Sequence, residues 1–276
     1  MNIRPSLAAA ALLLTPAGCH AASSGPAAAP NTAPATAPAT GKPSQAALIA
    51  SIPQRSSVPF HFAVSGGDDE MTGVIDGRHN AGEFDMVNDY PAAGYSLDID
   101  LLVLDRKAWV KLAYKKPRKG HTLPKQWLTL NYDKALRLNG GGPFDFGQEN
   151  DPGLVTQVFV YAQNVRAAGP GQISGTTDMT SMTGATFLGR DHFAALGSGA
   201  RAVPFTAVLD GAGRLSSLSV QVPAGGKFAA TTYHVAYTGY GSTARPEPPA
   251  AGDQIPAPDS TYELFRDAQY AGPDVG

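Results

Sequence analysis

The clearest alternation of apolar and polar residues in the chain is Tyr95-Ser96-Leu97-Asp98-Ile99-Asp100-Leu101. Successive side chains of a β-strand point to opposite faces, so Leu97, Ile99 and Leu101 share one face and both aspartates share the other. Paired carboxylates can act in acid–base catalysis. We interpret Asp98 and Asp100 instead as the solvated face of a half-buried strand.

The same period-2 pattern recurs on both sides of this strand. It predicts further strands at residues 58–64, 71–76, 109–114, 127–130, 203–209, 215–222 and 229–237. Asp210-Gly211-Ala212-Gly213 separates two of the late segments. Glycines tolerate positive φ, so this stretch predicts a hairpin turn.

Helical signals are few. A short helix is expected at residues 44–52, with Ser44 as its N-cap, and a helical turn at 191–196. A longer helix is expected from Asp151 to Arg166, with Leu154, Val158, Tyr161 and Val165 on one apolar stripe. The order of elements predicts an α+β fold, a strongly curved antiparallel sheet with helices on one face.

The first residues are typical of an export signal. Arg4 precedes a short apolar run, and Ala17-Gly18 stands directly before Cys19, the one cysteine of the chain. This junction resembles a bacterial lipobox, although Pro16 stands where leucine is usual. We expect cleavage after residue 18 and a diacylglycerol on Cys19, which would anchor the protein to the outer face of the cytoplasmic membrane. The alternative is an ordinary secretory signal.

Composition divides the rest of the chain into three parts. Residues 19–43 are rich in Ala, Pro and Thr and predict a disordered tether. Residues 44–241 carry the strand pattern and predict one β-rich domain. Residues 242–276 form a Pro-rich tail, and its apolar residues leave open whether it docks on the domain or frays.

The charges are nearly balanced, with a formal net charge of −2. This balance argues against a nucleic-acid-binding protein. Basic residues do concentrate between Arg106 and Lys125: Arg106, Lys107, Lys111, Lys115, Lys116, Arg118, Lys119 and Lys125. They fit either a solvated hairpin loop or a patch that meets anionic lipid headgroups.

No motif for catalysis or for a metal is visible in the sequence. The metalloprotease, nucleophile-elbow and phosphate-loop patterns are absent, and the histidines are far apart. Asp68, Asp69 and Glu70 are interpreted as an acidic turn, because a complete calcium-binding loop is missing. We therefore expect no enzyme, no cofactor and no metal.

Several short motifs occur in an ordered set. They are Val58-Pro59-Phe60-His61-Phe62, Trp109-Val110-Lys111 within 103–112, Lys125-Gln126-Trp127-Leu128, Asp151-Pro152, Ile173-Ser174-Gly175-Thr176-Thr177, Val203-Pro204-Phe205, Leu209-Asp210-Gly211-Ala212-Gly213-Arg214-Leu215 and 237–241. Together, behind a lipobox, they resemble the actinobacterial LppX/LprG-like lipoproteins of the LolA/LolB-like superfamily. Asp178-Met179 replaces the His/Tyr pair usual in that family, so the ligand or partner is expected to differ.

The resemblance implies a LolA-like half-open β-barrel wrapped around helices, with acyl chains of a lipid or lipoglycan held between sheet and helices. The leading hypothesis is therefore non-catalytic binding of an amphipathic lipid by a monomer, with transfer of that lipid as a further step. The expected lining residues are Phe60, Phe62, Leu97, Ile99, Leu101, Leu154, Val158 and Tyr161. The alternative is an envelope interaction or sensor lipoprotein with a filled core, no ligand and an unknown protein partner.

Overall fold

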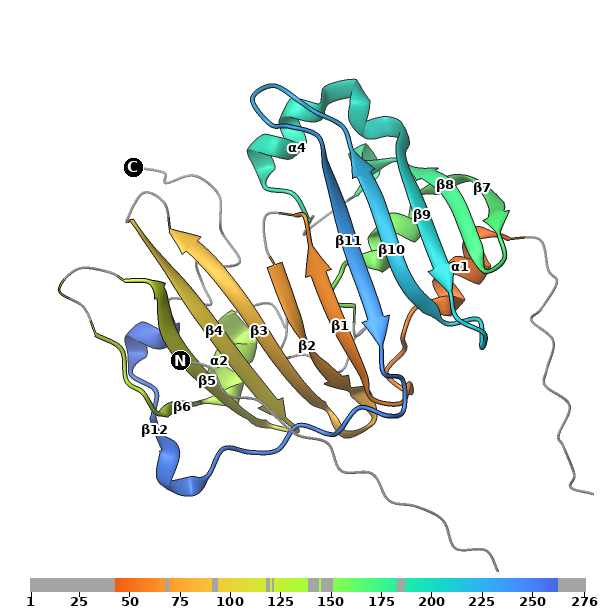
Figure 1. Cartoon of the computed structure of the whole chain (residues 1–276). Helices are drawn as coiled ribbons and strands as arrows, with labels where there is room; N and C mark the ends of the chain where they lie inside the picture. Colours follow the sequence, from red (N-terminus) through yellow and green to blue (C-terminus); the bar gives the residue numbers. More distant parts are fainter. Residues whose placement is uncertain are drawn as a thin grey trace, which may run out of the picture. The chain divides into compact units, whose positions relative to one another are not determined.

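Twelve strands of the computed structural model form one open, curved and mostly antiparallel sheet (Figure 1). The structure describes residues 43–67, 70–90, 94–117, 120, 122–138, 144, 151–182 and 187–262. The strands are β1 (Phe60–Ser65), β2 (Glu70–Asp76), β3 (Ala81–Tyr90), β4 (Tyr95–Leu104), β5 (Lys107–Lys116), β6 (Trp127–Leu130), β7 (Ala162–Gly169), β8 (Gln172–Thr177), β9 (Val203–Leu209), β10 (Leu215–Val222), β11 (Thr231–Thr238) and β12 (Gln254–Pro256).

The helices are short. They are α1 (Gln45–Ser51), α2 (Tyr132–Leu138), α3 (Val155–Val160) and α4 (Arg190–Leu196), with 3₁₀ turns η1 (Gly77–His79), η3 (Met179–Ser181), η4 (Gly197–Ala202) and η5 (Ala251–Asp253). In Figure 1, α2 lies behind strands β3 to β5, and α1 and α3 lie behind the half of the sheet formed by β7 to β11. The predicted α+β class and the predicted cap of α1 are confirmed, since Ser44 Oγ accepts a hydrogen bond from Ala47 N.

The strand order is β12-β6-β5-β4-β3-β2-β1-β11-β10-β9-β8-β7. Strand β1 joins two meanders, because it pairs with β2 on one side and with β11, from near the end of the domain, on the other. Phe62 lies opposite Gly73 on β2 and opposite Tyr237 on β11. We call the face that carries Phe62 the inner face.

Two glycines open space for phenylalanine rings on this inner face. A Cβ on Gly73 would stand 2.7 Å from Cε1 of Phe62, and a Cβ on Gly175 would stand 2.8 Å from the ring of Phe205. Each ring therefore lies directly over a backbone that carries no side chain. This packing explains why strands otherwise rich in β-branched and aromatic residues contain glycine at these two positions.

The segment around α3 covers the inner face of β8 to β11. The Tyr233 hydroxyl donates to Gly153 O at 2.7 Å, the Thr177 hydroxyl donates to Val158 O at 2.9 Å, and the Phe159 ring lies 5.8 Å from that of Phe205. These contacts fix residues 153–160 against three different strands. This half of the sheet therefore has its core closed by the chain itself.

The predicted helix from Asp151 to Arg166 is wrong in its second half. Helix α3 ends at Val160, and Ala162–Gly169 is the edge strand β7, paired with β8. The reversal that follows contains Pro170 and Gly171, and Gly171 has φ of +66°, so a hairpin turn connects β7 to β8. The helical spacing of Tyr161 and Val165 arises by coincidence.

The C-terminal segment docks on the domain over the residues that the structure describes. Strand β12 pairs in parallel with β6, Trp109 Nε1 donates to Gln254 Oε1 at 2.7 Å, and the Tyr262 hydroxyl accepts from Asn131 N at 2.6 Å. Tyr262 is only 4% exposed. The sequence left open whether the Pro-rich tail docks on the domain or frays. Up to residue 262, the tail docks.

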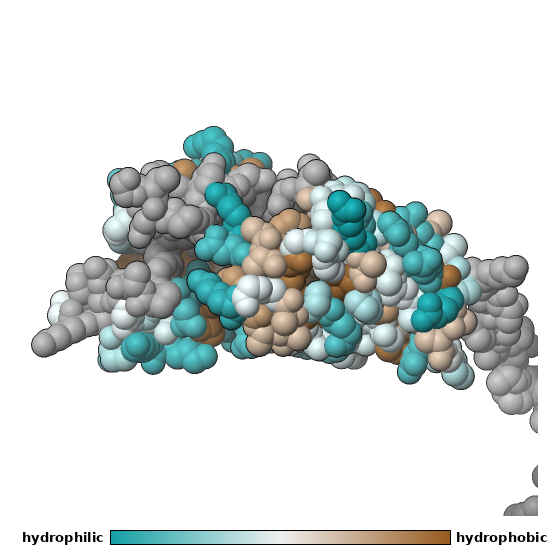
Figure 2. Space-filling model, turned by 90° about the horizontal axis from the view of Figure 1, so that it is seen from above, coloured by the Kyte–Doolittle hydropathy of each residue, from teal (hydrophilic) through white to brown (hydrophobic). Residues whose placement is uncertain are grey.

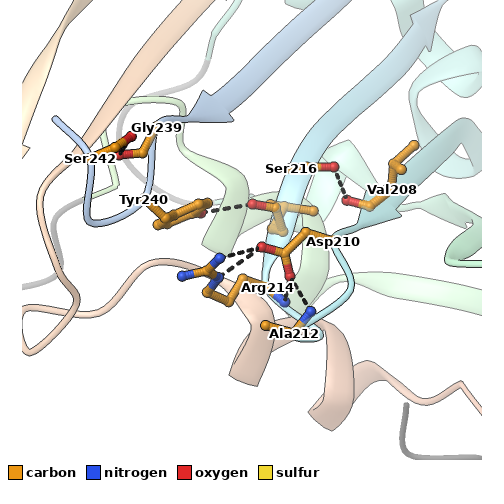
Figure 3. A network of polar contacts seen from close by, with 9 residues as sticks. Val208, Asp210, Ala212, Arg214, Ser216, Gly239, Tyr240 and Ser242 are labelled. Atoms are coloured by element: carbon orange, nitrogen blue, oxygen red, sulfur yellow. Dashed lines mark hydrogen bonds and ion pairs between the residues drawn. The ribbon is translucent and has the colours of Figure 1, made fainter. Parts of the chain in front are cut away.

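The hairpin predicted at Asp210 is confirmed, and its charged residues tie it to the chain after β11 (Figure 3). Asp210 Oδ1 accepts from the backbone N–H of Ala212 and of Arg214, and Oδ2 accepts from Arg214 Nε at 2.8 Å. The Arg214 guanidinium stacks 4.3 Å over the Tyr240 ring, whose hydroxyl donates to Leu215 O. The motif around Asp210 thus has a structural role.

Gly73→Ala tests whether the inner face depends on the close approach of Phe62. The added Cβ would also stand 2.0 Å from Glu83 O, so we expect a loss of about 1–3 kcal/mol in the free energy of unfolding, measured by chemical denaturation. Gly211→Ala is the control, because nothing lies within 4 Å of a Cβ there. Equal stability of the two variants would contradict this packing.

Candidate functional site

The inner face of β1 to β6 is a continuous apolar surface. The register aligns Phe62, Gly73, Phe84, Leu101 and Val110 in one row across five strands. The next row holds Val64, Met71, Met86, Ile99 and Leu112. Neighbouring side chains in such rows lie within contact distance. Five of the expected lining residues share this face: Phe60, Phe62, Leu97, Ile99 and Leu101.

Burial falls toward one end of this surface. Leu101 and Val110 are fully buried, whereas Met71, Met86, Tyr95 and Tyr114 are partly buried and pack at the border of the core. We call these four residues the Met–Tyr rim. They come from β2, β3, β4 and β5, and the Tyr95 and Tyr114 rings meet edge to face at 5.9 Å.

The rim combines two kinds of side chain that suit a boundary between an apolar surface and water. Methionine is flexible and polarisable and adapts to apolar ligands of irregular shape. Tyrosine has an apolar ring and a polar end. Lys115 and Lys116 directly follow Tyr114 and are exposed, so two cations stand beside the rim.

Helix α2 is the described helix that contributes to the core next to these strands. Asn131 Oδ1 accepts from Lys134 N and caps the helix, Ala135 is fully buried, and the Tyr132 hydroxyl donates to Phe144 O at 2.6 Å. Neither α2 nor the cap is evident from period-3.6 patterning, because the helix has seven residues. It is one element that sequence reasoning missed.

The other three expected lining residues belong elsewhere. Val158 is fully buried, but it lies on α3, over the other half of the sheet. Leu154 precedes α3 in a left-handed conformation, and Tyr161 follows its end and is partly buried. The buried residues of α3 are Val155, Val158 and Phe159. The stripe predicted from Leu154 to Val165 therefore does not face the apolar surface of β1 to β6.

A buried carboxyl group holds the start of α3. Asp151 Oδ1 accepts from Val155 N at 2.9 Å and from the Tyr237 hydroxyl at 3.3 Å, and Oδ2 accepts from Thr156 N at 2.6 Å. Burial raises the pKa of Asp151 despite these hydrogen bonds, which act to lower it. Burial likewise raises the pKa of Tyr237, and the nearby Asp151 carboxyl adds to that shift.

The outer face carries the acidic residues, as predicted for Asp98 and Asp100. Asp100 lies opposite Asp85 on β3 and opposite Lys111 on β5. Burial and then the negative charge of Asp85 raise the pKa of Asp100, and Lys111 partly offsets them. Lys111 Nζ also lies 5.8 Å from the centre of the Trp127 ring. These residues form a polar strand face.

Five of the eight predicted basic residues are spread along β5. Arg106 and Lys107 lie at the start of the strand, Lys111 in its middle and Lys115 and Lys116 at its end, a span of about 30 Å. Arg106 pairs with Asp133 and stacks over the Tyr132 ring. Lys125 is exposed before β6, and Arg118 and Lys119 lie outside the described residues.

The four histidines that the structure describes, His61, His79, His192 and His234, lie on separate elements. His79 Nδ1 contacts Asp76 Oδ2 at 2.6 Å, His192 stacks on Phe228, and His234 Nδ1 lies 3.0 Å from Ser219 Oγ. Among the described residues no three His, Cys, Asp or Glu side chains gather closely enough to hold a metal ion. Cys19, Asp68 and Asp69 lie outside the described residues.

The described helices are all too short or too polar to cross a bilayer. Large apolar side chains are also well covered: Val160 alone among the described ones is more than about a third exposed, at 42%. In the face shown in Figure 2, brown apolar areas are scattered between teal and white ones. A search against protein-family models and a search of curated proteins found no match for this chain.

The raised pKa of Asp151 predicts how stability depends on pH. A carboxyl whose native pKa is above its unfolded value near 4 favours folding when protonated, and this contribution is lost as pH rises through the native pKa. The stability of the wild type relative to Asp151→Asn should therefore fall from about pH 4 upward, by at most ~1.4 kcal/mol per pH unit. Denaturant unfolding of both proteins across pH measures this difference.

Asp210 supplies a control of opposite sign. Burial acts to raise its pKa, but hydrogen bonds from Arg214 and Ala212 outweigh burial, so the native pKa is lowered. The stability of the wild type relative to Asp210→Asn should be fully present above about pH 4 and fall below it. A flat pH dependence for Asp151→Asn would contradict the role assigned to the buried carboxyl group.

Proposed function

We propose that this chain is a lipid-anchored, extracytoplasmic lipoprotein that binds an amphipathic lipid on the inner face of β1 to β6. The burial gradient carries the proposal. The apolar rows are fully buried around Leu101 and become partly exposed at the Met–Tyr rim. An acyl chain that enters at the rim would pack against an apolar surface that is already present. Burial of each CH₂ group would contribute about 0.8 kcal/mol to the free energy of binding.

The polar part of the ligand would stay at the rim. Lys115 and Lys116 follow the rim residue Tyr114 and are exposed, so they would attract a negatively charged headgroup. The binding surface differs from the one expected from sequence, because the segment 151–160 packs on β8 to β11. Helix α2 covers part of β3 to β5 (Figure 1), so the acyl chain would enter at the rim. The function proposed is binding, with transfer as its extension, and is non-catalytic.

We propose a LolA-like half-open barrel as the architecture. Its support is an open, curved and mostly antiparallel sheet with short helices α1, α2 and α3 behind it (Figure 1). The ordered motifs also fall on regular elements, for example Trp109 and Val110 on β5 and Val203 to Phe205 on β9. Membership in the LppX/LprG-like group remains part of this proposal.

The anchor is proposed to be a diacylglycerol on Cys19. The lipobox-like sequence supports it, as does the tether of residues 19–43, which precedes the first described helix. About twenty-five Pro-rich residues in an extended polyproline II conformation would reach up to roughly 80 Å. A monomer held in this way could bring the Met–Tyr rim to the outer face of the cytoplasmic membrane.

The second candidate is an interaction lipoprotein with a filled core. The observation that favours it is that Phe60, Phe62, Leu97, Ile99 and Leu101 are each no more than 3% exposed and belong to one core cluster. A protein with such a core needs no ligand to cover its apolar surface. Its function would then depend on a protein partner at the cell envelope.

Native mass spectrometry of the chain from an actinobacterial host separates the two candidates. We expect a stoichiometric noncovalent lipid adduct on the wild type, in addition to the diacylglycerol on Cys19. Met86→Trp, on the inner face, should lose the adduct because the indole ring fills the rim. Thr72→Trp is the matched control, because Thr72 is exposed on the outer face of the neighbouring strand. An apo mass for the wild type, unchanged after incubation with membrane extract, favours the filled-core candidate.

Cys19→Ser tests the anchor separately from ligand binding. We expect the wild-type chain to fractionate with membranes and with the detergent phase, and the variant to move to the aqueous phase. Two acyl chains hold a protein on a bilayer and a hydroxyl group does not. If the variant stays in the membrane fraction to the same extent, Cys19 is not the anchor.

A further inference from the structure

The end of the sheet opposite the Met–Tyr rim contains a second candidate site. A hollow of about 480 Å³ is open to solvent and lined by Gln54, Arg55, Ser56 and Arg78. Three of these residues belong to the connection between α1 and β1, and Arg78 belongs to the turn η1 between β2 and β3. Two cations and no acidic residue line it.

Each arginine is held in place by the segment that carries the other. Arg55 Nη2 donates to Asn80 Oδ1 at 2.8 Å, and Arg78 Nε donates to Ser56 O at 2.6 Å. Both acceptors are uncharged, so these bonds orient the guanidinium groups without neutralising them. Each guanidinium has five N–H donors, and one of the five is used in each of these bonds.

The two supporting segments are themselves ordered by local hydrogen bonds. Gln54 N donates to Ser57 Oγ at 2.9 Å, and Gln54 Nε2 donates to Ile52 O at 3.1 Å. Asn80 ends η1 in the left-handed conformation, at φ of 48°, and its N–H donates to Gly77 O. The arginines are therefore presented by a preformed frame, which lowers the entropy cost of binding.

The carboxyl groups that the structure describes near the hollow do not pair with Arg55 or Arg78. Asp76 is 1% exposed and its Oδ2 contacts His79 Nδ1. Asp105 lies in the next turn, where its backbone N–H donates to Asn80 O. It is followed by Arg106, which pairs with Asp133, and by Lys107. Among the described residues neither Arg55 nor Arg78 pairs with a carboxylate, so the two guanidinium groups would attract anions from solution.

We propose that Arg55 and Arg78 form a binding site for a phosphate group. The planar fork of each guanidinium matches two phosphate oxygens, and two forks at one hollow would bind a single phosphate from two sides. The hollow is open, so the phosphate can carry a larger organic group outside it. The phosphate belongs either to a lipid headgroup at the membrane surface or to a soluble phosphorylated molecule. This site does not depend on acyl-chain binding, since the first half of β3, from Ala81 to Met86, separates it from the rim.

Titration of the full-length protein with inorganic phosphate at constant ionic strength tests the site directly. We expect saturable shifts of the arginine Nε–Hε signals in the NMR spectrum. Arg55→Gln and Arg78→Gln should each weaken phosphate binding about tenfold, because each removes a charge-assisted pair. Arg166→Gln is the matched control, an exposed arginine on the edge strand β7, and should bind as the wild type does.

Asn80→Gly tests the orientation of the Arg55 guanidinium separately from the positive charge of the two arginines. Glycine accepts the left-handed conformation of residue 80 and keeps both arginines, but it removes the acceptor that positions Arg55. We expect weaker binding than in the wild type and tighter binding than in Arg55→Gln. The proposal is overturned if the wild type shows no saturable shift, or if Arg166→Gln loses binding as strongly as Arg55→Gln and Arg78→Gln.

Vesicle flotation with the full-length Cys19→Ser protein distinguishes the two sources of phosphate. If the source is a lipid, the protein floats with phosphatidylcholine vesicles that contain phosphatidic acid, not with phosphatidylcholine alone, and Arg55→Gln abolishes flotation. If the source is soluble, inorganic phosphate binds and neither kind of vesicle floats the protein. Flotation that Arg55→Gln does not reduce, without saturable phosphate binding, overturns the proposal.

Discussion

The register of β1 is the constraint on which the rest of the structure depends. This strand of six residues joins the two meanders, with β2 on one side and β11 on the other. A slip of one residue would turn Phe60, Phe62 and Val64 outward and expose three apolar side chains. Gly73 opposes that slip, because the Phe62 ring occupies the space left over its backbone.

Polar contacts then fix the elements that cover the inner face. The Asp151 carboxyl accepts from the first backbone N–H groups of α3 and from the Tyr237 hydroxyl of β11, while the Tyr233 hydroxyl of the same strand donates to Gly153 O. At the other end of the sheet Tyr262 binds Asn131, the cap of α2. The contacts of Tyr233, Tyr237 and Tyr262 each join segments far apart in sequence. The two halves differ as a result. Strands β8 to β11 are covered by α3 and its preceding loop, whereas α2 covers part of β3 to β5 and the apolar rows continue to the Met–Tyr rim (Figure 1).

Period-2 alternation predicted most of the sheet, because the strand repeat is local. The bounds of β6 and β10 and the hairpin at Asp210 follow from residues within a few positions of one another. β3 was missed although Phe84 and Met86 alternate with Glu83 and Asp85. Gly82 and Asn88 interrupt the apolar face of β3. The alternation of apolar and polar residues in β3 is therefore recognised only once its pairing with β4 is known.

The candidate sites were harder to predict, because they depend on pairing between distant strands. Sequence periodicity placed Leu97, Ile99 and Leu101 on the apolar face, but the rim needs the register of four strands. The helix predicted beyond Val160 shows what sequence periodicity cannot predict. Tyr161 and Val165 fit a helical stripe, but Ala162–Gly169 is a strand because it pairs with β8. Arg55 and Arg78 are 23 positions apart, and no motif connects them.

The most direct measurement of the central claim is paramagnetic broadening of the methionine methyl signals by a lipid with a spin label on its acyl chain. The chain contains five methionines. Met71 and Met86 lie in the rim, and Met179 and Met182 are buried in the other half of the molecule. Lipid binding at the rim predicts strong broadening for Met71 and Met86 and little for Met179 and Met182. Equal broadening of all four, or none, would contradict it.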